Sequence, residues 1–250
     1  MNKNDRINKT RTMNCGYNCK IIAYRNSMDI DVEFIDNGEV VHNVTYDNFR
    51  NGRIKPLFLP TVFNVGIIGN SIISINGVKK QSYNIWQNML RRCYDEKYHQ
   101  KEPTYIGCTV CDEWRYFLNF EKWYEDNWYD IEGETMCLDK DILVKGNKIY
   151  SPNTCIFVPK KINSLFTKND NSRGNLPIGV TLCRNGKYRA QINRCGSKLN
   201  LGYYSSLEEA FLSYKTAKEK YIKEIAEYYK DIIPKKLYNS MLCYIVEITD

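Results

Sequence analysis

Residues 178–217 read IGVTLCRNGKYRAQINRCGSKLNLGYYSSLEEAFLSYKTA, and this stretch decides the fold of the C-terminal part of the chain. Polar and apolar residues alternate from Lys187 to Asn193, which is the period of a β-strand with two unlike faces. Asn185-Gly186 lies just before this run and is typical of a tight hairpin turn, with residues 179–182 as the preceding strand. The stretch therefore predicts an antiparallel hairpin with one apolar and one polar face.

A third strand and a helix are predicted to complete this small fold. The alternation returns over residues 198–201, where both leucines are expected to face inward. Ser206 and Glu209 have the spacing of a capping box, which marks the start of a helix. The predicted helix has one apolar stripe, formed by Leu207, Ala210, Phe211, Tyr214, Ala217, Tyr221, Ile222 and Ile225. We expect a three-stranded antiparallel sheet whose leucines and tyrosines pack on this helix.

The polar face of the predicted sheet is basic. Residues 171–207 include no acidic residue. Basic side chains alternate along the strands and their turn at Arg184, Lys187, Arg189 and Lys198. A solvated row of basic and polar groups is what the groove of a nucleic acid would meet. The plainer alternative is a small α+β domain whose basic face is only solvated.

The order of these motifs resembles the Apetala/ethylene-response-factor DNA-binding domain. The resemblance rests on G-V, N-G-K-Y-R-A-Q-I, L-G-Y-Y and S-L-E-E-A-x-x-x-Y-x-x-A, over roughly residues 176–228. It implies a sheet that enters the major groove of double-stranded DNA. By position it assigns the DNA contacts to Thr181, Arg184, Lys187, Arg189, Gln191, Asn193, Lys198 and Asn200. The family usually has arginine or tryptophan at the positions of Thr181, Asn193 and Asn200. The resemblance therefore implies lower DNA-sequence specificity for this sheet.

A second segment, residues 137–165, has the order strand, long loop, strand and short helix. It resembles the HNH nuclease motif of phage and mobile-element endonucleases, which often carry a separate DNA-binding module. The resemblance implies a ββα-metal core, in which Mg²⁺ or another divalent cation sits on the scissile phosphate. Together the two resemblances imply a nuclease core targeted by the C-terminal sheet.

The HNH resemblance assigns roles by position. Asp139 and Asn163 would hold the metal. Asn153 would be the loop asparagine that positions the catalytic base, with Asn147 as the other choice. Lys140 stands where the family has its catalytic histidine. An ordinary lysine has a pKa of about 10.4 and is protonated near neutrality, so it cannot accept a proton.

Because Lys140 replaces the catalytic histidine, three interpretations of residues 137–165 stay open. The segment could be an active nuclease or nickase if the nearby cation depresses the pKa of Lys140. It could be a degenerate nuclease core that still binds DNA, with the ammonium group holding a phosphate or filling the place of the cation. It could also be an unrelated structural hairpin.

The rest of the chain predicts two further regions. Short alternating runs, such as IDVEF at residues 30–34, are separated by tight turns and predict a small SH3-like β-barrel that could bind a protein partner. A helical middle follows, with a predicted apolar face of Tyr83, Trp86, Met89 and Leu90 and a predicted core of Trp114, Phe117, Leu118 and Phe120. The predicted fold class is α+β. The predicted domains are the barrel at residues 14–75, a helical plus HNH-like domain at 80–170, and the Apetala-type domain at 174–240.

The composition of the chain bears on its partners and on its location in the cell. The net charge of +7 over 250 residues favours an acidic partner, although modestly. Ten cysteines at irregular spacing predict reduced thiols and a cytoplasmic protein, in a bacterial host cell if a phage encodes it. Cys108-x-x-Cys111 lacks a second short pair, so zinc is not expected. No apolar run is long enough to span a membrane, and we expect no membrane partner.

Two functions follow as hypotheses. The first is a phage-type HNH-like DNA endonuclease or nickase targeted by the C-terminal sheet. The alternative is a catalytically inactive HNH-like protein with a DNA-binding or regulatory role, such as a phage-encoded inhibitor of a host nucleic-acid machine.

Overall fold

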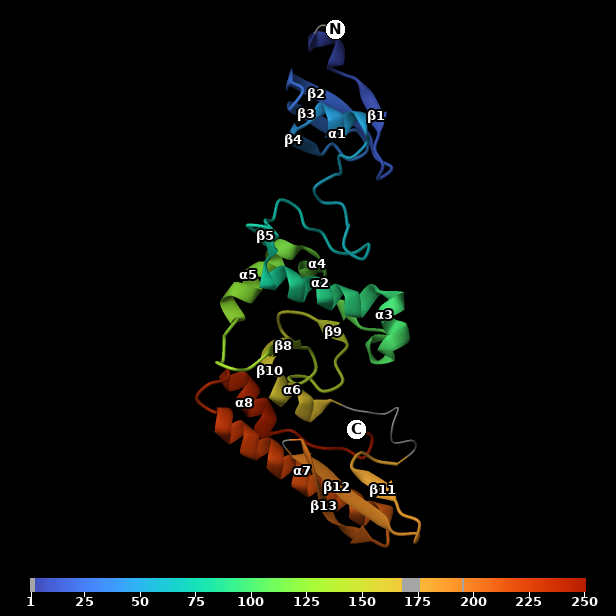
Figure 1. Cartoon of the computed structure of the whole chain (residues 1–250), viewed down its shortest axis with the longest axis vertical. Helices are drawn as coiled ribbons and strands as arrows, with labels where there is room; N and C mark the ends of the chain where they lie inside the picture. The colour runs from blue at the N-terminus through green and yellow to red at the C-terminus, as the bar shows by residue number, and fades with distance from the viewer. Residues whose placement is uncertain (1–2, 168–175, 195) are drawn as a thin grey trace. The chain divides into compact units, whose positions relative to one another are not determined.

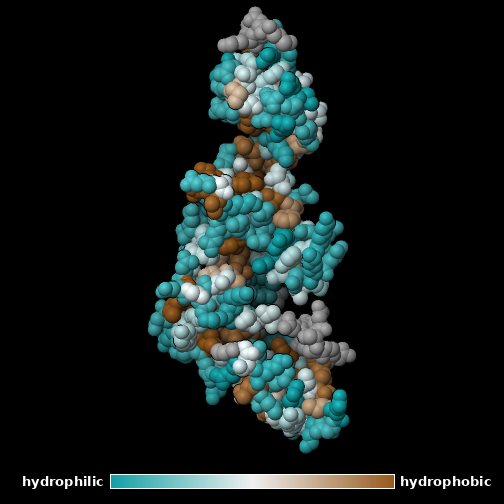
Figure 2. Space-filling view, viewed as in Figure 1, coloured by the Kyte–Doolittle hydropathy of each residue, from teal (hydrophilic) through white to brown (hydrophobic). Residues whose placement is uncertain are grey.

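The computed structural model of the chain describes residues 3–167, 176–194 and 196–250. It divides into two compact units, Met1–Glu125 and Asp126–Asp250. Each unit combines helices with short antiparallel sheets (Figure 1), which confirms the expected α+β class. Hydrophilic residues predominate on the surface seen in Figure 2, with smaller hydrophobic areas among them. In the described part of the chain, no helix has the length and apolar character that a membrane span requires.

The first unit begins with a four-stranded antiparallel sheet in the order β1-β2-β3-β4. Its elements are η1 (Lys3–Arg6), β1 (Thr10–Thr12), β2 (Asn18–Asn26), β3 (Asp29–Phe34), β4 (Val40–Val44) and α1 (Tyr46–Arg50). Buried residues of β2 and β3 lie opposite each other, Ile21 with Val32 and Cys19 with Phe34. Among the described strands, β1 and β4 are the two edges and do not pair with each other. The predicted closed SH3-like barrel is therefore not confirmed.

The remainder of the first unit is mainly helical. Its elements are β5 (Ser74–Ile75), β6 (Val78–Lys79), α2 (Gln81–Tyr94), α3 (Glu96–Lys101), η2 (Pro103–Tyr105), β7 (Thr109–Val110), α4 (Asp112–Arg115) and α5 (Phe117–Asn127), the last of which runs past the unit boundary. The predicted apolar face of α2 is buried, and the Trp86 indole N–H donates to the Trp114 carbonyl oxygen at 2.7 Å. Phe117 and Phe120 are also buried, as predicted. The prediction for Leu118 was wrong: it is 64% exposed, because it lies about 100° around α5 from Phe117.

The described part of the second unit combines short antiparallel strands with one long helix and two short ones. In chain order its elements are β8 (Met136–Asp139), β9 (Ile149–Tyr150), β10 (Ile156–Pro159), α6 (Lys160–Phe166), β11 (Val180–Leu182), β12 (Tyr188–Arg194), β13 (Ser197–Tyr204), α7 (Leu207–Tyr229) and α8 (Lys235–Leu242). Strands β11, β12 and β13 form the predicted three-stranded antiparallel sheet. Helix α7 packs on one face of this sheet (Figure 1).

The junction of sheet and helix forms as predicted except at Leu199, which was expected to pack inward but is 48% exposed. The Ser206 hydroxyl accepts a hydrogen bond from the Glu209 amide at 3.1 Å and caps α7, as predicted. Val180, Ala190 and Ile192 of the sheet are buried against the apolar stripe of α7. Gly179 has a φ of 76°, and a Cβ atom there would lie 2.0 Å from the Tyr214 ring. A glycine is therefore required where β11 approaches α7.

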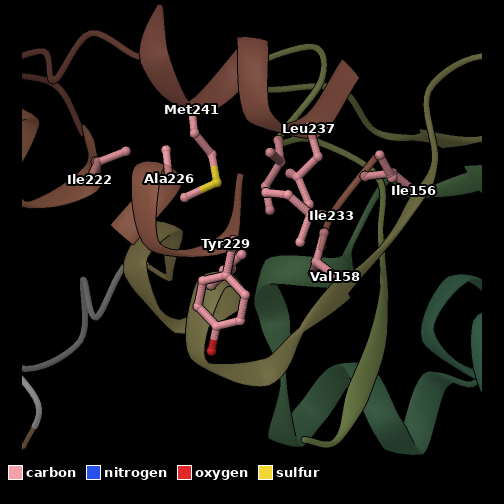
Figure 3. Packing of buried hydrophobic residues seen from close by; sticks show 10 residues of the cluster. Ile156, Val158, Ile222, Ala226, Tyr229, Ile233, Leu237 and Met241 are labelled. Carbon is pink, nitrogen blue, oxygen red and sulfur yellow. The ribbon is translucent and has the colours of Figure 1, made fainter. Parts of the chain in front are cut away.

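The ββα segment also has the predicted order of elements. Strand β8 pairs antiparallel with β10, with Asp139 opposite Ile156, and α6 begins directly after β10. The two strands, α6, the C-terminal half of α7 and α8 enclose one core (Figure 3). Its buried residues are Ile142, Ile156, Val158, Ile162, Ile222, Ala226, Tyr229, Ile233, Leu237 and Met241.

Helix α7 serves both cores of the second unit. Leu165, Ile225 and Tyr244 contact both the ββα core and the core beneath the C-terminal sheet. The predicted domain boundary at residues 170–174 lies outside the described residues. The other predicted boundary, at residues 75–80, falls on the β5–β6 hairpin. The division into three domains stays a prediction.

Candidate functional site

The strand register places six of the eight predicted contact residues in three cross-strand rows on the face of the sheet opposite α7. Thr181 lies opposite Arg189, which lies opposite Tyr203. Gln191 lies opposite Asn200, and Asn193 lies opposite Lys198. We call the outward face the surface formed by Thr181, Arg184, Lys187, Arg189, Gln191, Asn193, Lys198, Asn200 and Tyr203. The structure thus gathers all eight predicted contact residues and adds one.

The hairpin turn extends the outward face with two exposed basic side chains. Arg184 and Lys187 lie on either side of Asn185-Gly186. The Cys183 amide donates to the Lys187 carbonyl oxygen at 2.8 Å, and Gly186 has the positive φ, 77°, that the turn requires. The Asn185 side-chain oxygen accepts from the Lys187 amide at 3.1 Å. These bonds hold the two basic residues at the end of the sheet.

Tyr203 is the residue of this face that sequence reasoning missed. Counting alternate residues from Asn200 would place Gly202 and Tyr204 outward. The register shifts by one residue at Ala190 and Gln191, so Leu201 is the extra residue of a β-bulge. Tyr203 consequently points outward and is 54% exposed. Tyr204 turns inward, where its hydroxyl donates to the Ser213 hydroxyl oxygen at 2.8 Å.

The charges of the sheet are divided between its two sides. The Arg189 guanidinium donates weakly to the Thr181 hydroxyl at 3.4 Å and remains on the outward face. Arg194 instead forms an ion pair with Glu224 of α7 and lies 4.7 Å from the Tyr221 ring centre. No acidic residue occurs from Leu176 to Leu207, so no carboxylate of the sheet itself offsets the positive charge of the outward face.

At the end of β8, Asp139 organises the loop that follows. One carboxylate oxygen, Oδ1, accepts hydrogen bonds from the amides of Asp141 at 2.9 Å and Ile142 at 2.8 Å. Burial, followed by the nearby charge of Asp141, raises the pKa of Asp139 to about 6, although the two amide bonds favour the ionised form. The second carboxylate oxygen, Oδ2, is not used in these two bonds.

Lys140 is held away from the role of a free base. Its side chain is only 12% exposed, and the ammonium nitrogen lies 3.0 Å from Asp141 Oδ2. The same nitrogen lies 5.9 Å from the centre of the Tyr150 ring. Both contacts are electrostatically favourable for an ammonium group. The ion pair is with Asp141, and the positive charge of Lys140 also lowers the pKa of Asp139 against the larger effect of burial.

The loop asparagine that contacts Lys140 is Asn147. Its side-chain amide donates to the carbonyl oxygens of Lys140 and Ile149, both at 2.7 Å, and its oxygen accepts from the Ile149 amide at 3.2 Å. Asn153, the first choice from the sequence, is exposed in the loop before β10. The sequence offered both asparagines, but only the folded loop shows which one spans it.

Asn163 lies on α6, partly buried, in the helix that packs on β8 and β10. A Mg²⁺ ion uses few protein oxygens and keeps several waters. Asp139 ends β8 and Asn163 lies on α6, and each offers an oxygen atom of the kind that Mg²⁺ binds. Among the described residues, no group of three or more His, Cys, Asp or Glu side chains is placed to hold a metal ion.

The comparisons with known proteins add no relative. No protein-family model matches the chain, and neither curated proteins nor solved structures show a significant match to it.

Proposed function

We propose that this protein binds double-stranded DNA through the outward face of its C-terminal sheet. The observation that carries the proposal is the cross-strand order of that face. Basic, amide and aromatic side chains stand in neighbouring rows, and the sheet contributes no acidic side chain.

The geometry suits a groove of the duplex. The major groove admits a small β-structure, and long side chains on one face of a sheet reach base edges. Arg189 and Gln191 lie on the central strand, where they would meet the floor of the groove. Arg184, Lys187 and Lys198 are exposed at the borders of the face, where phosphates would lie.

The test compares two pairs of charge-removing substitutions. Arg189→Gln with Lys198→Gln changes the outward face, whereas Lys220→Gln with Lys223→Gln removes two exposed charges from α7. Binding to a labelled duplex is measured by fluorescence anisotropy over a series of salt concentrations. The first pair is expected to weaken binding at least about tenfold and to reduce the salt slope by roughly one to two. Equal losses in both pairs would show that charge alone, and not this face, binds DNA.

A second candidate function, metal-dependent cleavage of DNA, is favoured by the ββα segment. When bound, a divalent cation would polarise the scissile phosphate. Asp139 and Asn163 would hold it, and Asn147 fixes the loop that presents Lys140. The Lys140 ammonium could hold a phosphate oxygen but is not placed as a base. The sites for both functions lie in the second unit.

Nicking of supercoiled plasmid in Mg²⁺ or Mn²⁺ tests this second function. Asp139→Asn retains an oxygen for the two loop amides but removes the charge, so it should abolish nicking without unfolding the loop. Asp130→Asn, an exposed aspartate of the same unit, is the control. Absence of nicking in the unsubstituted protein would leave the catalytically inactive DNA-binding protein. In that case Lys140→His, which restores the residue of the HNH pattern, is the variant in which activity could appear.

A further inference from the structure

A cavity of about 960 Å³ lies within the second unit, between α6, β12 and α7. Its size falls at the upper end of ordinary small-molecule sites, which are about 300–1,000 Å³. Ser164 of α6 and Thr167, which directly follows α6, form one wall, and Ile192 of β12 forms another. Among the described residues, none from the loop after Asp139 lines this volume.

The lining combines rings with positive charge. Tyr214, Tyr221 and Tyr228 of α7 line the cavity, as do Lys161, Lys198 and Lys218. The described residues that line it include no Asp or Glu. Aromatic walls suit a flat ring, and lysines without lining carboxylates suit an anion.

Lys218 is one of the three lysines that line this cavity. It is partly buried on α7, and burial lowers its pKa to about 8, because water that would solvate the ammonium is largely excluded. No carboxylate among the described residues neutralises it. Lys161 differs, because its ammonium is paired with Glu134 at 2.5 Å. A desolvated amine without a counter-ion is unfavourable in the empty protein and would become favourable next to a bound anion.

The cavity is continuous with the outward face. Gln191, Asn193 and Lys198 line the cavity and also belong to that face. We propose that the cavity binds one nucleotide, with the phosphate at Lys218 and the base against the tyrosine rings. The nucleotide is either free or swung out of a strand bound on the outward face. The second source rests on the proposed DNA binding, whereas the first does not.

Isothermal titration with dAMP, deoxyadenosine and inorganic phosphate tests the site on the full chain. Binding of dAMP should exceed that of either part alone, because ring and phosphate both contribute. Lys218→Met should weaken dAMP binding about tenfold, as expected for one charge-assisted contact, and Lys218→Arg should retain it. Lys220→Met, on an exposed position of the same helix, should leave it unchanged.

A second arm separates the two sources of the nucleotide. Duplexes with and without one unpaired nucleotide are compared in the unsubstituted protein and in Lys218→Met. A preference for the unpaired nucleotide that Lys218→Met removes, with affinity for the paired duplex unchanged, supports a nucleotide swung out of the strand. Binding of dAMP without that preference supports a free nucleotide.

Two outcomes overturn the proposal. One is the absence of both dAMP binding and the preference for the unpaired nucleotide. The other is dAMP binding that survives Lys218→Met unchanged. Binding of the paired duplex would still stand in either case, so failure of the cavity is distinguishable from failure of the outward face.

Discussion

Tyr203 lies directly opposite Arg189 on the neighbouring strand of the C-terminal sheet. This pairing exists because a β-bulge adds Leu201 to β13 and reverses the faces of the residues after it. The Asn200 side-chain oxygen accepts from the Gly202 amide at 3.2 Å and closes the bulge. An exposed aromatic ring therefore lies in the same row as the central arginine of the outward face.

Tyr203→Ala is expected to weaken duplex binding by roughly five- to tenfold, about the effect of losing one aromatic contact with a nucleic acid. The substitution removes no buried surface of the helix side, so the unfolding midpoint should not change. Anisotropy titrations and thermal unfolding measure the two quantities. Tyr116→Ala, at another exposed tyrosine in the first unit, is the control and should leave binding intact. Unchanged affinity in Tyr203→Ala would exclude Tyr203 from the interface.

Local patterns predicted most of the second unit. Period-two alternation, the Asn185-Gly186 turn and the Ser206 cap each depend on neighbours in the chain, and each is confirmed. The bulge could not be predicted in this way, because an extra residue in one strand is defined only by its pairing with the neighbouring strand. The face assigned to every residue after Asn200 depends on that partner.

The candidate loop shows the same limit. Asn147 and Asn153 are both asparagines in the loop between two predicted strands, and the sequence alone favoured Asn153. In the folded loop the Asn147 side-chain amide donates to the Lys140 carbonyl oxygen at 2.7 Å, and the role assigned to Asn153 stays a prediction. The sequence also did not predict that α7 contributes to two cores. The apolar stripe of a helix shows that the helix is buried on one side, but not which element each residue contacts.

Asn147→Ala should destabilise the second unit by about 1–3 kcal/mol, because the Lys140 carbonyl oxygen and the Ile149 amide lose their hydrogen bonds to Asn147. The Ile149 carbonyl oxygen also loses one bond but keeps the one from the Thr154 hydroxyl. Asn153→Ala, at an exposed position of the same loop, should change stability by less than about 0.5 kcal/mol. Urea unfolding of both variants measures the difference. Equal effects would mean that Asn147 does not span the loop in solution.

Gly179→Ala is expected to disturb the packing of the sheet on α7. Its Cβ would lie 2.0 Å from the Tyr214 ring at a φ of 76°, so a cost of about 2–4 kcal/mol is expected from steric overlap and backbone strain. Gly186→Ala is a matched control, because its φ is 77° but nothing lies within 4 Å of its Cβ. It should cost only about 1 kcal/mol from backbone strain. Similar losses in the two variants would show that β11 is not packed against Tyr214.

Lys218→Met should stabilise the protein near neutral pH, although it removes a charge from the surface of a cavity. Burial lowers the pKa of Lys218 to about 8 in the folded protein, below its ordinary value of 10.5. The folded state therefore opposes protonation of this amine, and the charged form is destabilising at every pH below about 8. Removing the amine should raise the free energy of unfolding at pH 7 by about 1–3 kcal/mol.

The pH dependence of this effect gives its signature. Between pH 8 and 10.5 the unfolded chain binds more protons at Lys218 than the folded chain does, so stability due to this group rises with pH. The advantage of Lys218→Met should therefore be constant below pH 8 and shrink as the pH rises toward 10. Urea unfolding at pH 7, 8, 9 and 10 measures it, and subtracting the two proteins cancels the titration of groups they share. Lys220→Met, at an exposed lysine, should show neither the gain nor its pH dependence. A gain for Lys218→Met that does not change with pH would mean that the methionine stabilises by packing alone and that the amine is well solvated in the folded protein.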